Sequence, residues 1–140
     1  MTKFSRLINA IIVVIIVASL SSCYNLEAKK YYSEKSNYIT VSGKVSHISY
    51  NKEQTVLYIG FAEMSEEFDD NCFKIIEDNL KIGKNNGIDD VLCLGKRVEF
   101  VTAPRYFGDG YVMPIVALSI DGKCYLKFDD GYNNLMRWLN

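Results

Sequence analysis

Residues 38–50 read YITVSGKVSHISY, and this stretch sets the pattern from which the fold is predicted. Every second position from Ile39 to Val45 is apolar or glycine, and the positions between them are polar. This is the period of a strand with one buried face. The alternation changes parity by Ile48, so a bulge or bend is expected between residues 43 and 47.

Short runs of residues typical of strands, separated by turn residues, follow this stretch toward the C-terminus. Residues 111–120 are apolar on both faces, which predicts the central strand. Asp121-Gly122 is a strong two-residue hairpin signal. The predicted strands cover residues 39–50, 57–61, 73–76, 97–102, 111–120 and 124–128, with a short helix or turn pair in 77–94 and a helical turn in 129–140.

The order of these elements resembles the OB-fold among small β-barrels. A long bent strand is followed by two more strands, a helical connection and a final meander, over roughly residues 38–128. The predicted fold class is therefore mainly β: a small OB-like antiparallel barrel with a short helical insertion and a C-terminal helical turn. Domains of this kind often bind oligonucleotides or oligosaccharides, but a fold does not fix a function.

The N-terminus has a different pattern. Lys3 and Arg6 precede an apolar stretch from Leu7 to Ser19, which is followed by Leu20-Ser21-Ser22-Cys23. The stretch has the length of a signal-peptide h-region and is shorter than the ~20 residues that span a bilayer comfortably. Positive charge at the start favours retention of that end in the cytoplasm.

This segment resembles the signal peptide and lipobox of a bacterial lipoprotein precursor. The resemblance implies that residues 1–22 are removed and that Cys23 carries the lipid that anchors the protein to the membrane. Residues 23–37 show no sustained period and are interpreted as a tether, and residues 38–140 as the barrel domain. The alternative is an uncleaved anchor helix with an incidental Cys23. Both interpretations place the folded part outside the cytoplasm, in the cell envelope.

The net charge of the chain limits the classes of partner that it is expected to bind. The chain has 16 basic and 17 acidic residues, so loss of Lys3 and Arg6 would leave 14 against 17 and a net charge near −3. Nucleic-acid binding draws most of its affinity from neutralised phosphates, so this balance argues against a polyanion held by charge alone. A local basic patch remains compatible with it.

The remaining cysteines are Cys72, Cys93 and Cys124, an odd number that cannot all pair internally. One disulfide with three possible pairings is compatible with an oxidising compartment, and three small buried hydrophobes are the alternative. No C-x-x-C or Cys/His cluster predicts zinc. The acidic segment 63–71 does not match a calcium-binding EF-hand loop and is interpreted as solvated. No metal or cofactor is predicted.

The densest candidate binding surface combines cations with aromatic rings near one predicted hairpin. Such a mixture can stack on a base, a sugar or a partner's side chain. In the alternative interpretation, Phe107 and Tyr111 cap the end of the barrel and Arg105 is merely solvated. The candidate residues are Arg97, Arg105, Tyr106, Phe107 and Tyr111.

No catalytic residues are predicted, because His47 is the only histidine and no nucleophile, base or carboxylate pair stands out. The leading hypothesis is a lipid-anchored extracytoplasmic module that binds an envelope protein or a small ligand. An alternative is an OB-like oligonucleotide or oligosaccharide binder, whose affinity for a polyanion would fall steeply with salt. A third is a hydrolase, which would need titratable groups converging in a pocket.

Overall fold

The structure is a computed structural model that describes residues 3–65, 67–108 and 110–140, without the side chains of residues 4 and 16–24. Five of its strands close into a barrel in the order β1-β2-β3-β5-β4-β1, because β3 pairs in parallel with β5. This confirms the predicted small, mainly β barrel, and its strand order is compatible with an OB-like fold. The strands are β1 (Ile39–Tyr50), β2 (Leu57–Ala62), β3 (Cys72–Ile75), β4 (Arg97–Thr102) and β5 (Met113–Ile120).

The bend predicted in the first strand is present. The register between β1 and β2 shifts between Val45 and His47, which leaves Ser46 as the extra residue of a bulge. Gly43 lies before the bulge, where a Cβ atom would come within 2.7 Å of the Phe61 ring. Glycine therefore permits the close approach of β1 to β2 that the curved barrel needs.

The remaining elements follow the predicted order. A sixth strand, β6 (Lys123–Leu126), pairs with β5 across the two-residue turn Asp121-Gly122, where both residues have positive φ. The helical insertion between β3 and β4 consists of α2 (Glu77–Asn85) and η2 (Ile88–Asp90). The predicted C-terminal turn is longer than expected and forms the helix α3 (Phe128–Leu139).

Two groups of apolar side chains hold the structure together. The barrel core fills the inside of the barrel and includes Phe61, Phe73 and Phe100, whose rings lie 4.5 to 5.4 Å apart. A second group, which we call the outer cluster, lies outside the barrel, where it includes residues of α1 and α3. Its buried members are Ala28, Tyr32, Ile76, Ala103, Phe107, Val116, Leu135 and Leu139.

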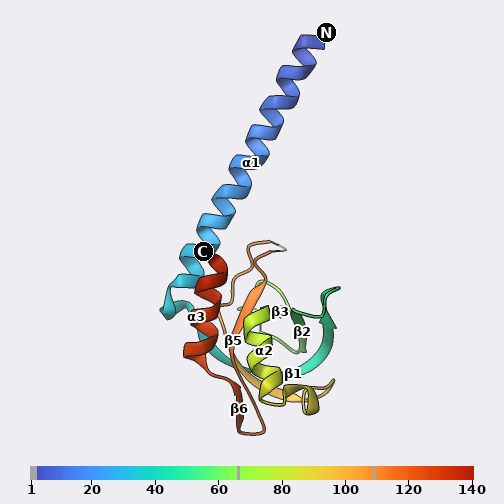
Figure 1. The fold of residues 1–140 in the computed structure, drawn as a ribbon, viewed down its shortest axis with the longest axis vertical. Helices are drawn as coiled ribbons and strands as arrows, with labels where there is room; N and C mark the ends of the chain where they lie inside the picture. Colours follow the sequence, from blue (N-terminus) through green and yellow to red (C-terminus); the bar gives the residue numbers. More distant parts are fainter. Residues whose placement is uncertain (1–2, 66, 109) are drawn as a thin grey trace.

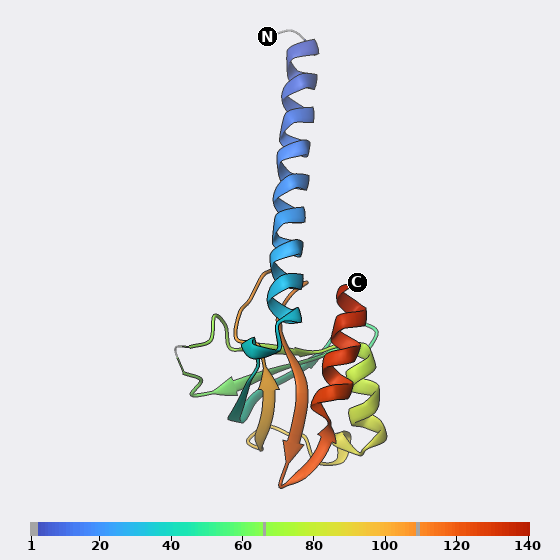
Figure 2. The ribbon, with the colours of Figure 1, turned by 90° about the vertical axis from the view of Figure 1, so that its left-hand side faces the viewer.

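The first helix, α1 (Lys3–Ser33), projects from the barrel and meets it only near its C-terminal end (Figures 1 and 2). Ala28 and Tyr32 are buried, and η1 (Lys35–Asn37) joins α1 to β1. Two residues of segment 23–37, which was interpreted from the sequence as a tether, therefore pack against the barrel domain. Ala28 and Tyr32 are four residues apart on one helix face, so both reach the outer cluster.

Candidate functional site

The N-terminal part of α1 exposes a continuous apolar surface. The seven aliphatic side chains Leu7, Ile8, Ile11, Ile12, Val13, Val14 and Ile15 are each 41 to 66 % exposed. A patch of this kind marks a contact with membrane or protein. The Cys23 side chain, which is expected to carry the lipid from the resemblance to a lipobox, lies outside the described residues. In the part of the chain that the structure describes, no helix has both the length and the hydropathy needed to cross a membrane.

The three downstream cysteines are free thiols rather than partners in a disulfide. Cys93 and Cys124 are exposed, so the interpretation of all three as buried hydrophobes does not hold. Cys72 is half-buried on β3. Burial, together with the nearby charge of Asp70, raises the pKa of the Cys72 thiol. A thiol that stays protonated is a poor nucleophile.

The predicted basic and aromatic residues lie mostly in the β4–β5 loop, whose described residues 103–108 and 110–112 include several that pack against the C-terminal end of α1. The Tyr32 hydroxyl donates to the carbonyl oxygens of Arg105 and Tyr111, at 2.7 and 2.9 Å. The Arg105 guanidinium lies 4.6 Å from the centre of the Phe107 ring and 5.4 Å from that of Tyr31. These contacts hold the loop in one place and attach α1 to the barrel.

The structure does not bring all five predicted binding residues together. Arg97 opens β4 and Arg105 follows the end of that strand, so five strand steps, roughly 17 Å, lie between Arg97 and Thr102 alone. Phe107 is only 8 % exposed within the outer cluster and offers little surface for stacking. The backbone N–H of Tyr106 donates to Asp69 Oδ2 at 3.1 Å, which joins the loop to the acidic segment.

Tyr111, at the end of this loop, contacts a surface that the sequence analysis missed. Its ring lies 5.8 Å from the Trp138 ring on α3, and the Lys74 ammonium lies 4.6 Å from the centre of the same Trp138 ring. Lys74 sits on β3 directly opposite Tyr58 of β2. We call the surface formed by Tyr58, Lys74, Tyr111 and Trp138 the Lys74 site.

Strand alternation explains why the Lys74 and Tyr58 side chains point out of the barrel. Phe73 and Ile75 flank Lys74 and belong to the barrel core, so Lys74 points outward. Leu57 and Ile59 flank Tyr58 in the same way. The outer faces of β2 and β3 and the β4–β5 loop are the regions with which OB-like barrels commonly bind their ligands.

The position of Trp138 is fixed by the packing of α3. Asn134 Nδ2 donates to Asn79 Oδ1 at 2.9 Å, and Asn79 Nδ2 donates to the Gly131 carbonyl at 3.1 Å, so buried amides connect α3 to α2. Gly131 lies so close to β5 that a Cβ atom would be 1.8 Å from the Val116 carbonyl oxygen. This close packing fixes the position of α3, the helix that carries Trp138.

Lys74 is the one buried charged side chain among the described residues, at 8 % exposure. Burial lowers the pKa of its ammonium. The sequence contains one indication of this buried lysine, because Lys74 interrupts an otherwise apolar run over residues 73–76. The contact with Trp138 could not be foreseen, because α3 returns to β3 only through tertiary packing.

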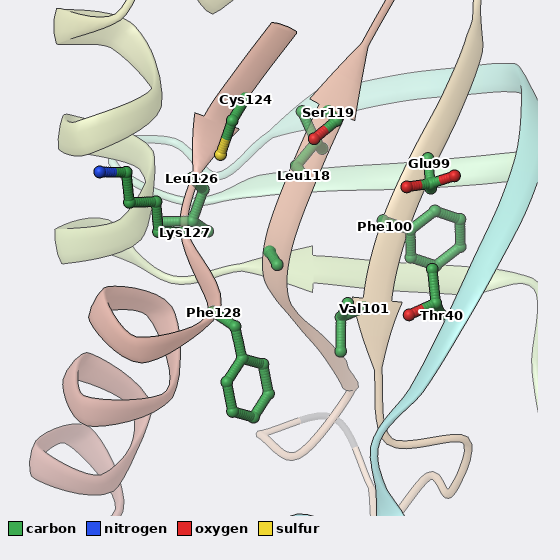
Figure 3. Close-up of a pocket in the computed structure, with 11 residues that line it drawn as sticks. Thr40, Glu99, Phe100, Val101, Leu118, Ser119, Cys124, Leu126, Lys127 and Phe128 are labelled. Atoms are coloured by element: carbon green, nitrogen blue, oxygen red, sulfur yellow. The ribbon is translucent and has the colours of Figure 1, made fainter. Parts of the chain in front are cut away.

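A hollow of about 300 Å³ lies on the outer face of β4 and β5 beside β6 (Figure 3). Glu99 and Ser119 lie on neighbouring strands toward one end, and the Phe128 ring lies toward the other. No described group of three His, Cys, Asp or Glu side chains, here or elsewhere, could hold a metal ion. Glu99 is the only carboxylate among the described residues that line it, so they offer no pair of carboxylates for acid–base chemistry.

Comparison of the chain with protein-family models, with curated proteins and with solved structures finds no match.

Proposed function

We propose that the protein is a lipid-anchored binding module of a bacterial cell envelope, with Cys23 as the lipidated residue and the barrel as the binding domain. The observation that supports this most directly is the run of exposed aliphatic side chains in α1, which leaves the barrel and precedes Leu20-Ser21-Ser22-Cys23. Such a surface is unfavourable in water and suits a translocating signal peptide.

Processing before Cys23 would leave a short helical spacer. Tyr32 lies nine positions after Cys23, which corresponds to roughly 14 Å of helix at 1.5 Å per residue. Because Tyr32 is fixed to the β4–β5 loop, this end of the barrel would face the lipid bilayer (Figure 2). The barrel would stand close to the membrane in a restricted orientation.

Binding accounts for the domain better than catalysis. The described residues place a buried cation beside a partly exposed aromatic ring, an arrangement that suits the binding of a ligand. The second candidate function, an oligonucleotide or oligosaccharide binder, is favoured by the strand order of the barrel. The separation of Arg97 from Arg105 weakens the polyanion surface on which that candidate depends.

Metabolic labelling with a fatty acid in a bacterial host tests the anchor. The wild-type protein should incorporate label and lose its first 22 residues, whereas Cys23→Ser should remain unlabelled at full length. Cys93→Ser is the matched control, because it removes an exposed thiol elsewhere and should be labelled like the wild type. Label on Cys23→Ser, or none on the wild type, would contradict the proposed lipidation.

A further inference from the structure

Lys74 is a buried cation without a counter-ion. No carboxylate of the described residues lies within 4.0 Å of its ammonium. Its partner is the face of the Trp138 ring, whose centre lies 4.6 Å away. Burying a charge without an ionic partner is unfavourable. An anion that approaches the ammonium therefore stabilises a site of this kind.

The Lys74 ammonium is not completely enclosed. Among the described residues, Thr102 Oγ1 is the only fully buried side-chain polar atom without a hydrogen-bond partner, so the Lys74 Nζ atom retains some contact with solvent. Trp138 is 44 % exposed, and Tyr58 and Tyr111 are half-buried. Aromatic faces therefore lie beside the charge and are partly open.

The charges around the site favour a small ligand over a polymer. A hollow of about 210 Å³ adjoins Trp138, and Glu77 and Asp78 line it together with Arg137. Lys81 pairs with both carboxylates, at 3.4 and 3.9 Å. Arg137 and Lys81 balance the two carboxylates, so the surface beside Trp138 has no excess positive charge to hold a chain of phosphates, whereas a single anion at Lys74 needs none.

We infer that the Lys74 site binds a small ligand in which one anionic group is attached to a flat apolar ring. The anion would accept a charge-assisted hydrogen bond from Lys74, and the ring would stack against Trp138. This inference rests on the proposal that the barrel acts by binding, but it does not depend on the lipid at Cys23.

Trp138 is the only tryptophan of the chain, so its fluorescence reports directly on the site. We would titrate the full chain, in micelles of a non-ionic detergent, with benzoate, with its neutral analogue benzamide and with acetate. Benzoate should change the emission saturably and bind about tenfold more tightly than benzamide, the ratio expected for one charge-assisted hydrogen bond. Acetate, which lacks the ring, should produce no saturable change.

Variants then assign the effect to Lys74. Lys74→Met should abolish the difference between benzoate and benzamide, and Lys74→Arg should retain it. Lys84→Met is the matched control, because the exposed Lys84 lies 5.4 Å from the Tyr50 ring elsewhere on the surface, and it should behave like the wild type. Thermal unfolding of each variant would verify that it folds, and the wild-type comparison of benzoate with benzamide needs no variant.

Three results would overturn the inference: equal affinities of wild type for benzoate and benzamide, an unchanged preference in folded Lys74→Met, or no response to benzoate. Tighter, strongly salt-dependent binding of a single-stranded oligonucleotide at Trp138 would also overturn it, in favour of polyanion binding. Failure of fatty-acid labelling would remove the anchor but leave these titrations unchanged, so the two proposals fail separately.

Discussion

Tyr32 provides a quantitative test of whether the end of α1 belongs to the folded domain. The side chain is 1 % exposed, and its hydroxyl lies 2.7 Å from the Arg105 carbonyl oxygen and 2.9 Å from that of Tyr111. A hydroxyl has one proton to donate, so the two carbonyls share it. Tyr32→Phe leaves both without this donor, and we expect it to lower the free energy of unfolding by about 1–2 kcal/mol.

Removal of the ring should have a larger effect. The Tyr32 ring meets Tyr31 and Phe107 edge to face, with centroids 5.6 and 5.5 Å away. Tyr32→Ala creates a cavity in the outer cluster, for which we expect a loss of about 3–5 kcal/mol, as for other buried aromatic side chains. At about 4 °C per kcal/mol, the melting temperature should fall by roughly 4–8 °C for Tyr32→Phe and further for Tyr32→Ala.

The measurement is urea unfolding of the full chain followed by circular dichroism, with Tyr31→Phe as the matched control. Tyr31 is the preceding residue, is half-buried, and its hydroxyl makes no hydrogen bond to a described residue. Its substitution should change stability by less than about 0.5 kcal/mol. Equal stability of Tyr32→Phe and Tyr31→Phe would refute the reasoning and would place the domain boundary at residue 38, as the sequence suggested.

Two further outcomes follow from close packing and from buried hydroxyls. Gly131→Ala should destabilise the domain by about 3 kcal/mol or more in the same assay, because its Cβ would lie 1.8 Å from the Val116 carbonyl oxygen, whereas Gly110→Ala, with no heavy atom within 4 Å, should be nearly neutral. Burial raises the pKa values of Tyr32 and Tyr38 above 10, so above about pH 10 the unfolded chain loses protons that the folded chain keeps. The free energy of unfolding should therefore fall as the pH rises past 10, and a slope unchanged in Tyr32→Phe would contradict this assignment.

Local sequence signals predicted the barrel well. The alternation after Ile39, the parity change before Ile48 and the Asp121-Gly122 turn each depend on neighbours along the chain, and each appears in the structure. Strand period and turn chemistry are local properties, so they could be inferred without tertiary information.

The attachment of α1 could not be predicted from such signals. Residues 24–37 carry too few apolar positions to show a helical period, and among the side chains described there Ala28 and Tyr32 supply the buried face. Tyr32 is buried because the β4–β5 loop provides carbonyl acceptors for its hydroxyl. That loop lies more than seventy residues further along the chain, so no local pattern reports the contact.

The candidate site was predicted only in part, for a related reason. Concentration of basic and aromatic residues in the sequence pointed to the β4–β5 loop, and Tyr111 does contact the Lys74 site. Phe107 and Arg105 instead pack around the base of α1. Composition can locate such residues on a loop, but which of them face a ligand depends on the elements that the loop meets.

The position of the Lys74 site constrains the ligand once the proposed anchor is considered. The Tyr32 hydroxyl bonds the Tyr111 carbonyl, and the Tyr111 ring contacts Trp138 beside Lys74, so the site lies near the attachment of α1. With a lipid on Cys23, only roughly 14 Å of helix would separate that attachment from the membrane. A folded partner about 30 Å across would not fit into this space, since a domain of 100 residues alone has a radius of gyration near 13 Å. A small anionic ligand would fit, and it could be released from or delivered to the membrane surface without passing across the far side of the barrel.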